Sequence, residues 1–271
     1  MSNTPTPQPW RNPVKVRLES DQPAIGLTVS VNHPEPAIQA AAMGFDFLWI
    51  EMEHSPVSLD TVRSIVLGTR GLPAVPFARV PVNELWMAKR VLDAGVLGVI
   101  FPFSSTPALA RQAADACHYP PYGRRGSGAG LASFRWTAPE GYYDFADQNV
   151  VTVIVIEEEK ALEQIDEIAA TPGVDVLFVG PSDLSFSMGL RGDMAHPRVA
   201  EAMKRVVTAA KQNGKATGRY VTGTEDMQRA LDQGFRLLQA GTELDFVKAG
   251  AQQWLGPLGR WRDPGKSPGT Y

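Results

Sequence analysis

Charged side chains stand at the ends of short apolar runs in this 271-residue chain. Glu157 ends the run 151–156, and Asp183 follows the run 174–179 after a Gly-Pro-Ser break. Two carboxylates brought together repel each other unless a cation or a shared proton lies between them. Carboxylate oxygens are the ligands that Mg²⁺ and Mn²⁺ prefer. We therefore predict that Glu157 and Asp183 bind a divalent metal.

Two further apolar runs end in a candidate base and a candidate cation. Residues 45–50 lead into Glu51, Glu53 and His54, and Arg79 lies at the end of the run 74–80. A histidine beside carboxylates suits a general base, because their charge raises its basicity. A guanidinium suits an oxygen that gains negative charge during a reaction. Together these residues predict an acid-rich pocket with one arginine and one histidine.

Each of these residues also has a simpler structural explanation. Glu157 opens an acidic triplet that could merely begin a helix, where the helix dipole favours negative charge. Asp183 could be only a helix N-cap, which is a common use of aspartate. A lone histidine such as His54 is often structural, and Arg79 could be a surface cation. The prediction of a site depends on all four positions meeting at one rim.

The elements that must bring them together follow a strand-then-helix rhythm. Continuous apolar strands are typical of parallel sheets covered on both faces. Eight such repeats favour a single-domain α/β fold, the (β/α)8 TIM barrel, in which all carboxyl ends of the strands share one rim. The predicted strands are 24–31, 45–50, 74–80, 97–101, 151–156, 174–179, 216–221 and 235–240.

The barrel is expected to fill residues 23–255, after an N-terminal arm (1–22) and before a C-terminal tail (256–271). A short helix is expected near 14–18, one helix at 160–170 and a last helix at 241–254, and Asn83 is expected to cap the helix 84–94. The rhythm is lost in a long loop at 118–149, where Pro- and Gly-rich residues 119–128 cannot form a regular element. Loops of this length are usually functional or disordered.

Composition excludes several classes of protein. A net charge of -3 gives no electrostatic support for binding nucleic acid or an anionic membrane, and no apolar run reaches the roughly 20 residues of a membrane helix. Residues 1–9 do not resemble a signal peptide. Cys117 is the single cysteine, so a disulfide framework is ruled out and a cytoplasmic location is expected. No Gly-x-Gly-x-x-Gly or P-loop motif supports a nucleotide site.

Four segments resemble the HpcH/HpaI family of metal-dependent, class II pyruvate aldolases. They are FDFLWIEMEHSP (45–56), ARVP (78–81), YPPYGRRG (119–126) and FVGPSDLS (178–185), within a likeness that runs from about residue 24 to 247. The resemblance implies a TIM barrel that cleaves or forms 4-hydroxy-2-oxo acids through a pyruvate or hydroxypyruvate enolate. The other product or partner is an aldehyde, and a trimer or hexamer is implied.

The resemblance also implies roles for individual residues. Glu157 and Asp183 match the ligands of a divalent metal, Mg²⁺, Mn²⁺ or Co²⁺. Arg79 matches the residue that stabilises the enolate, and His54 matches the base. The backbone amides of Ser182 and Asp183 match the pyruvate-carboxylate site. Asp93 matches an acid that reaches the histidine of a neighbouring subunit.

The chain departs from the family pattern at three positions. Glu51 stands where an Asp is usual, Val155 where a substrate-binding Gln is usual, and Glu243 where an Asp is common. Two other functions therefore stay open: decarboxylation of a 2-oxo diacid such as oxaloacetate, and silent binding of a 2-oxo acid. Aromatic side chains suggest a partly apolar substrate tail, although they are as often core residues: Trp49, Phe101, Phe103, Phe134 and Trp136.

Overall fold

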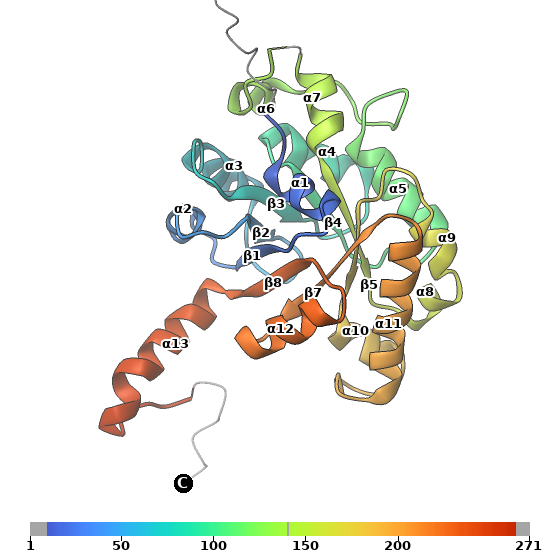
Figure 1. Ribbon diagram of the computed structural model, residues 1–271. Coiled ribbons are helices and arrows are strands. Elements are labelled where there is room, and N and C mark those ends of the chain that lie inside the picture. Colours follow the sequence, from blue (N-terminus) through green and yellow to red (C-terminus); the bar gives the residue numbers. More distant parts are fainter. Residues whose placement is uncertain (1–9, 140, 264–271) are drawn as a thin grey trace, which may run out of the picture.

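The computed structural model describes residues 10–139 and 141–263, and its strands coincide with the eight apolar runs (Figure 1). Val, Ile, Leu and Phe dominate these runs, and such side chains fit a sheet that is covered on both faces. The strands are β1 (Ala24–Val29), β2 (Phe47–Glu51), β3 (Val75–Arg79), β4 (Gly98–Phe101), β5 (Val151–Ile156), β6 (Val176–Val179), β7 (Ala216–Val221) and β8 (Leu237–Thr242).

The sheet closes on itself. Each strand pairs in parallel with the next, and β1 also pairs in parallel with β8. The predicted (β/α)8 barrel is therefore confirmed. In such a barrel every strand ends at the same rim, where TIM-barrel enzymes keep their active sites.

Helices alternate with the strands, and most of those between β1 and β8 cover the outside of the barrel (Figure 1). They are α1 (Pro13–Glu19), α2 (Pro34–Ala41), α3 (Leu59–Gly68), α4 (Leu85–Ala94), α5 (Pro107–Cys117), α6 (Gly130–Arg135), α7 (Tyr142–Asn149), α8 (Glu159–Glu163), α9 (Ile165–Ala169), α10 (Pro181–Ser187), α11 (Pro197–Gln212), α12 (Thr224–Asp232) and α13 (Glu243–Leu255), followed by the 3₁₀ turn η1 (Gly256–Leu258).

Several helix boundaries differ from the prediction. The helix expected at 160–170 is split into α8 and α9 at Gln164, whose ψ of 21° breaks the first helix. The last helix begins at Glu243 and not at Gly241, because β8 extends to Thr242. Asn83 was expected to cap α4, but Glu84 is the N-cap, and the Asn83 amide donates to Ser104 Oγ and the Leu109 carbonyl instead.

The predicted long loop at 118–149 contains two short helices, α6 and α7. Residues 119–128 are irregular, as predicted. The helices escaped prediction because each is too short to show a helical repeat of apolar residues. Parts of two other predicted regions, residues 1–9 of the arm and 264–271 of the tail, lie outside the described residues.

The core has two layers, one inside the barrel and one between barrel and helices. Inside, large aromatic rings pack against glycines of neighbouring strands. A Cβ at Gly98 would lie 2.2 Å from the Phe77 ring, and one at Gly26 would lie 2.3 Å from the Phe47 ring. This alternation of large and small side chains fills the interior, so the barrel has no open channel.

The amino-terminal end of the barrel is covered by α1. Val14 packs with residues that begin strands, among them Ala24 and Val151. Asn12 caps α1, and its amide donates to the carbonyls of Leu97 and Asn149 at 3.3 and 2.8 Å. With this end covered, the rim at the carboxyl ends of the strands is left for a catalytic site.

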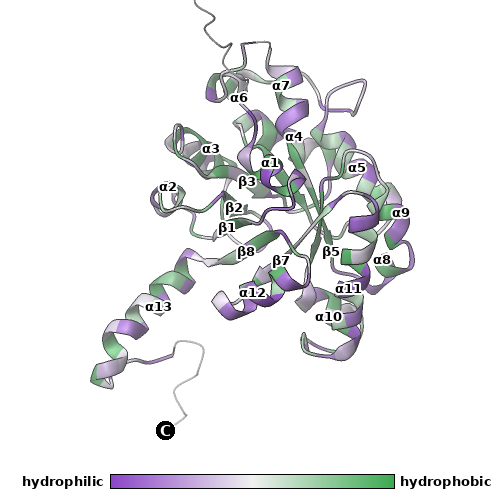
Figure 2. Ribbon diagram, in the orientation of Figure 1, coloured by the Kyte–Doolittle hydropathy of each residue, from purple (hydrophilic) through white to green (hydrophobic). Residues whose placement is uncertain are grey.

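The last helix, α13, projects away from the barrel (Figure 1), and apolar residues, coloured green, recur along its ribbon (Figure 2). None of its residues is buried. Within residues 10–139 and 141–263, no helix is both long and apolar enough to span a membrane.

Candidate active site

The candidate residues reach the same rim because each follows the carboxyl end of a strand. Glu51 and Arg79 are the last residues of β2 and β3 and are paired in the sheet register. Glu157 directly follows β5, and Asp183 lies in the first turn of α10, after β6. The rim therefore brings together residues that are more than 100 positions apart in the sequence.

Glu51 holds Arg79 in place. Its Oε2 accepts hydrogen bonds from Arg79 Nε at 2.6 Å and from the Trp49 indole at 3.1 Å. Its Oε1 accepts from the backbone N–H groups of Glu53 and His54, at 2.7 and 3.0 Å. Burial opposes ionisation of Glu51, but the Arg79 charge and these hydrogen bonds hold its pKa below the ordinary value. The pair is thus an ionised, nearly buried clamp.

Glu53 is the second acid on Arg79. Its Oε2 lies 3.1 Å from Arg79 Nη1, as an ion pair outside hydrogen-bonding geometry. Burial raises the pKa of Glu53; the Arg79 charge opposes this rise, and the negative charges of Glu51 and Asp183 add to it. Arg79 is therefore shared between two carboxylates and keeps a fixed direction.

The His54 ring is the most exposed part of this group, with 65% of its side chain accessible. Its Nε2 lies 3.6 Å from Glu53 Oε2. Glu51 contacts the backbone N–H of His54. In a single chain the imidazole is therefore steered by Glu53, and it faces solvent at the mouth.

Glu157 is 3% exposed, and its Oε1 accepts a hydrogen bond from the Phe103 N–H at 2.6 Å. Burial is the main cause that raises its pKa to about 7, and the charges of Glu53 and Asp183 contribute. Glu157, Glu53 and Asp183 are thus close enough to repel one another. Glu157 precedes α8, whose N-cap is Glu158, so it does not begin that helix.

Asp183 is exposed at the third position of α10 and makes no cap hydrogen bond. Gly180 is the N-cap, so the interpretation of Asp183 as a cap is wrong. The adjacent Ser182 is also in the first turn, where backbone N–H groups of a helix have no partner within the helix. Because Asp183 does not cap α10, its carboxylate is available to bind a ligand.

The donor set fits a hard divalent cation. Arg79 pairs with Glu51 and Glu53, and the negative charges of Glu53 and Asp183 help to raise the pKa of Glu157, so one guanidinium leaves negative charge uncompensated. In the described part of the chain, no group of three or more His, Cys, Asp or Glu side chains is arranged to hold a metal. Two carboxylate ligands with the remaining positions left to water and substrate suit Mg²⁺ or Mn²⁺.

Val155 lies one layer below Glu157 and is 2% exposed. It is paired with Phe178 in the register, and a Cβ at Gly180 would lie 3.4 Å from its Cγ1. The same added Cβ would lie 3.1 Å from the Glu157 Oε2, so glycine at 180 keeps room beside both side chains. The floor under Glu157 is therefore apolar.

Asp93 lies in the last turn of α4, which returns toward the amino-terminal end of the barrel. Its Oδ1 accepts from Arg125 Nη2 at 3.0 Å, and burial raises its pKa. The fully buried Arg125 side chain also stacks on the Tyr119 ring at 4.6 Å. Asp93 is thus remote from His54 of its own chain, and a contact between them requires a second chain.

Two residues named in the sequence analysis make contacts at the rim that the sequence did not predict. Phe103 has a φ of 50°, a conformation rare for a bulky residue, and this turns its N–H toward Glu157. Glu243 accepts from the backbone N–H groups of Ser30 and Val31 at 2.8 and 2.5 Å, which ties the loop after β1 to α13. Backbone contacts of this kind leave no pattern in a sequence.

The aromatic residues expected to suggest a substrate tail are scattered. Phe101 is fully buried, and Trp49 packs on Phe178 inside the barrel with centroids 4.8 Å apart. Trp136 donates to the Gly95 carbonyl beyond the end of α4, far from the rim. Of the five, only Phe103 is exposed next to the acids.

Comparison with known proteins identifies the relatives of this chain. The sequence model of the HpcH/HpaI aldolase/citrate lyase family matches residues 24–249. A hydroxypyruvate/pyruvate aldolase of Paraburkholderia phytofirmans is 36% identical over 91% of this chain and 97% of its own length. A 5-keto-4-deoxy-D-glucarate aldolase of Salmonella arizonae is 34% identical over 89% of this chain and 94% of its own length.

Solved structures agree with these relatives. The crystal structure of a family member from Burkholderia cenocepacia J2315 superposes with a TM-score of 0.84 and 35% identity, over 91% of this chain and 99% of that one. An HpcH/HpaI aldolase from Desulfitobacterium hafniense DCB-2, 24% identical, has the same fold with a TM-score of 0.84 over 94% of this chain and 98% of that one. The chain therefore belongs to the HpcH/HpaI aldolase/citrate lyase family and is a carbon–carbon lyase.

Proposed function

We propose that this chain is a metal-dependent aldolase that cleaves or forms a 4-hydroxy-2-oxo acid, with pyruvate or hydroxypyruvate as one partner and an aldehyde as the other. One observation carries the proposal: Arg79, paired with Glu51 and Glu53, lies at the same rim as Glu157 and Asp183, which follow β5 and β6. A fixed guanidinium near two carboxylates that would bind a metal ion suits the stabilisation of negative charge that develops on an oxo group.

A divalent cation, Mg²⁺, Mn²⁺ or Co²⁺, held by Glu157 and Asp183 would supply Lewis-acid polarisation of the 2-oxo group. Arg79 donates to the same oxygen and stabilises the enolate that is left when the C3–C4 bond breaks. The carboxylate of the substrate accepts from the backbone N–H groups of Ser182 and Asp183 at the start of α10, where such groups are unpaired. No lysine is needed.

His54 takes the proton of the 4-hydroxyl group, and Glu53 orients its ring. The His54 side chain is exposed in the single chain, and a neighbouring subunit would cover it. Asp93 of a second chain is the acid proposed to reach it. The active site would then be completed only in an oligomer, a trimer or hexamer, working in the cytoplasm.

Names of the relatives suggest the substrate class. One is a hydroxypyruvate/pyruvate aldolase and another a 5-keto-4-deoxy-D-glucarate aldolase, so both act on small oxygenated acids. The apolar floor at Val155 offers no hydrogen bond to the donor. We therefore propose that the donor is held mainly by Arg79, the amides of α10 and the cation.

Exchange of the pyruvate methyl protons for deuterium, followed by NMR, tests the enolate step without knowledge of the aldehyde. Exchange should require added Mg²⁺ or Mn²⁺ and stop with EDTA. Glu157→Gln and Asp183→Asn should abolish it. Glu159→Gln is the matched control, because this nearby acid is exposed and pairs with Arg198.

Two results would contradict the proposal. Binding of pyruvate without exchange would indicate a silent 2-oxo acid binder. Release of CO₂ from oxaloacetate, with no condensation of pyruvate with any aldehyde of a panel, would indicate a decarboxylase that uses the same enolate.

A further inference from the structure

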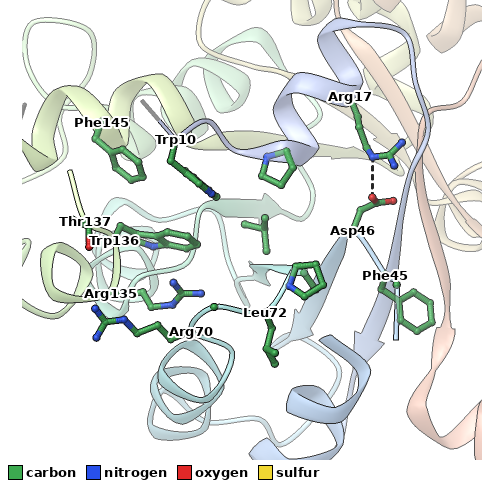
Figure 3. A pocket seen from close by; sticks show the side chains of 16 residues that line it. Trp10, Arg17, Phe45, Asp46, Arg70, Leu72, Arg135, Trp136, Thr137 and Phe145 are labelled. Carbon is green, nitrogen blue, oxygen red and sulfur yellow. Dashed lines mark ion pairs between the residues drawn. The ribbon is translucent and has the colours of Figure 1, made fainter. Parts of the chain in front are cut away.

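A cavity of about 690 Å³ lies at the amino-terminal end of the barrel, opposite the candidate active site (Figure 3). Its walls come from α1 and the residues before it, from the segments that precede β2 and β3, and from the last residue of α6 and the two residues that follow it. Val75 at the start of β3 lines it, whereas Arg79 ends that strand, about 13 Å away. A molecule bound here would not touch the catalytic residues.

The cavity carries excess positive charge. Its lining includes Arg17, Arg70 and Arg135 but one carboxylate, that of Asp46. Asp46 is already occupied, because its Oδ1 pairs with Arg17 Nε at 2.9 Å and its Oδ2 accepts from the Ile25 N–H at 2.8 Å (Figure 3). Within residues 10–139 and 141–263, Arg70 and Arg135 therefore have no acidic partner.

Arg135 is held rigidly in the wall. It is 6% exposed, its Nε and Nη2 donate to the carbonyls of Val66 and Thr69 at 2.9 and 3.1 Å, and its guanidinium stacks 4.0 Å from the Trp136 ring. Burial, and then the charge of Arg70, lower the pKa of Arg135 to about 10. It stays protonated at neutral pH, so two neighbouring guanidinium groups lack a counter-charge.

Aromatic rings form the adjoining wall. Trp10 lies 4.9 Å from Trp136 and 5.7 Å from Phe145, measured between ring centroids. In Figure 3 Arg135 lies between Trp136 and Arg70. Flat rings offer a stacking surface, and guanidinium groups bind carboxylates through paired, charge-assisted hydrogen bonds. A cavity with a few polar groups on apolar walls is typical of small-molecule sites.

We propose that this cavity is a second ligand-binding site that takes a planar aromatic carboxylate. The carboxylate pairs with Arg70 and with the free edge of Arg135, and the ring packs against Trp10 and Trp136. Arg70 is the exposed member and closes over the ligand, because its side chain is restrained in the described structure only by the Phe134 ring, 5.0 Å away.

Isothermal titration calorimetry of the full chain with naphthalene-2-carboxylate tests this site. We expect saturable binding with one molecule per chain, and neutral naphthalene-2-methanol should bind at least about tenfold more weakly. Arg70→Gln should weaken binding of the carboxylate by about tenfold or more. Arg63→Gln, an exposed arginine of α3 outside the cavity, is the matched control and should change binding less than about twofold.

A second variant keeps the test independent of folding. Arg135 also donates to a carbonyl at the end of α3, so its removal is expected to destabilise the chain. Trp10 is 42% exposed, so Trp10→Ala should weaken binding of the carboxylate without unfolding the chain. Saturating pyruvate with Mg²⁺ should leave the affinity unchanged. Absence of binding, equal affinity in Arg70→Gln, or displacement by pyruvate would each overturn the proposal.

Discussion

Glu51 fixes the direction of the Arg79 side chain. Glu51 stands where the family usually has an aspartate, and its carboxylate accepts from Arg79 and from two backbone N–H groups. The longer side chain reaches across from β2 to β3. Glu51 thus fixes the Arg79 guanidinium and does not polarise the His54 ring.

Replacement of Arg79 by lysine tests this role. Lysine keeps the charge but cannot donate through both Nε and Nη2 to Glu51. We expect kcat/KM for aldol cleavage to fall by about 100- to 1000-fold, because one donor to the developing oxyanion is misplaced. Arg111→Lys, at an exposed arginine paired with Asp115, is the control and should leave kcat/KM unchanged. Full activity in Arg79→Lys would remove Arg79 from the mechanism.

Val155 allows a second test at the residue scale. Val155→Gln places an amide on the apolar floor beneath Glu157, where its polar atoms lack partners, and should lower the free energy of unfolding by about 1–3 kcal/mol. Part of this loss should return when pyruvate and Mg²⁺ are added, since the substrate offers hydrogen bonds.

Chemical denaturation with and without pyruvate measures both effects. Val153→Gln is the control, because Val153 is buried two residues earlier in β5, farther from the rim, and is out of reach of the substrate. An equal response of the two variants to pyruvate would show that position 155 does not face the substrate.

At the scale of elements, strand ends and helix starts are joined by polar clamps. On the side of β7, Arg219 Nη2 donates to Asp226 Oδ1 of α12 at 2.7 Å, and Asp226 Oδ2 accepts from the Thr222 N–H at 3.0 Å. The hydrogen bonds from Arg219 and Thr222 outweigh burial and lower the pKa of Asp226 to about 2. The clamp holds the loop between β7 and α12 at the rim.

This clamp predicts a pH dependence of stability. The folded pKa is below the unfolded value, so the stabilisation is present above pH 4 and is lost as pH falls through about 2. Asp226→Asn should lower the free energy of unfolding by about 2 kcal/mol at pH 7, from a shift of roughly 2 units at 1.36 kcal/mol each, discounted for partial exposure.

Urea denaturation of both chains between pH 2 and 7 measures this difference. It should shrink steadily below pH 4. Asp232→Asn, on the same helix but bonded only to the exposed Gln228 side chain, is the control and should show no such trend. A difference that is constant with pH would contradict the assignment.

At the scale of the whole molecule, the barrel could be predicted because apolar strands and their spacing are local signals. The residues that end those strands could be named for the same reason, as with Glu157 and Asp183. The atoms that these residues contact could not be predicted, because the direction of the Glu51 side chain and the left-handed turn at Phe103 depend on distant partners. The helices at 130–149 are too short to carry a periodic pattern.

The exposed apolar side chains of α13 are not explained by packing within a single chain. The helix extends away from the barrel (Figure 1). Its large apolar side chains are exposed to solvent, and these include Phe246, Val247 and Trp254, which are 52, 67 and 79% exposed. Phe246 packs against Phe45, with ring centroids 5.9 Å apart. Apolar patches of this kind mark interaction sites, and a neighbouring subunit is the partner we propose.

If α13 and the turn η1 that follows it hold the oligomer together, polar residues on them will dissociate the assembly. We expect the unchanged chain to have three or six times the 29.4 kDa of one chain in sedimentation velocity, and Trp254→Ser combined with Leu258→Ser to shift it toward 29.4 kDa. Aldol activity should fall with it, because His54 then loses the Asp93 of a second chain.

Met43→Ser is the control for this experiment, since Met43 is 72% exposed in the segment between α2 and β2, outside α13 and η1, and its change should leave the mass unaltered. Loss of the oligomer with full retention of activity would separate the two roles and would place the complete active site within one chain. An unchanged chain that sediments as a monomer at micromolar concentration would remove the oligomer from the mechanism altogether, and the exposed His54 would then have to act with Glu53 alone.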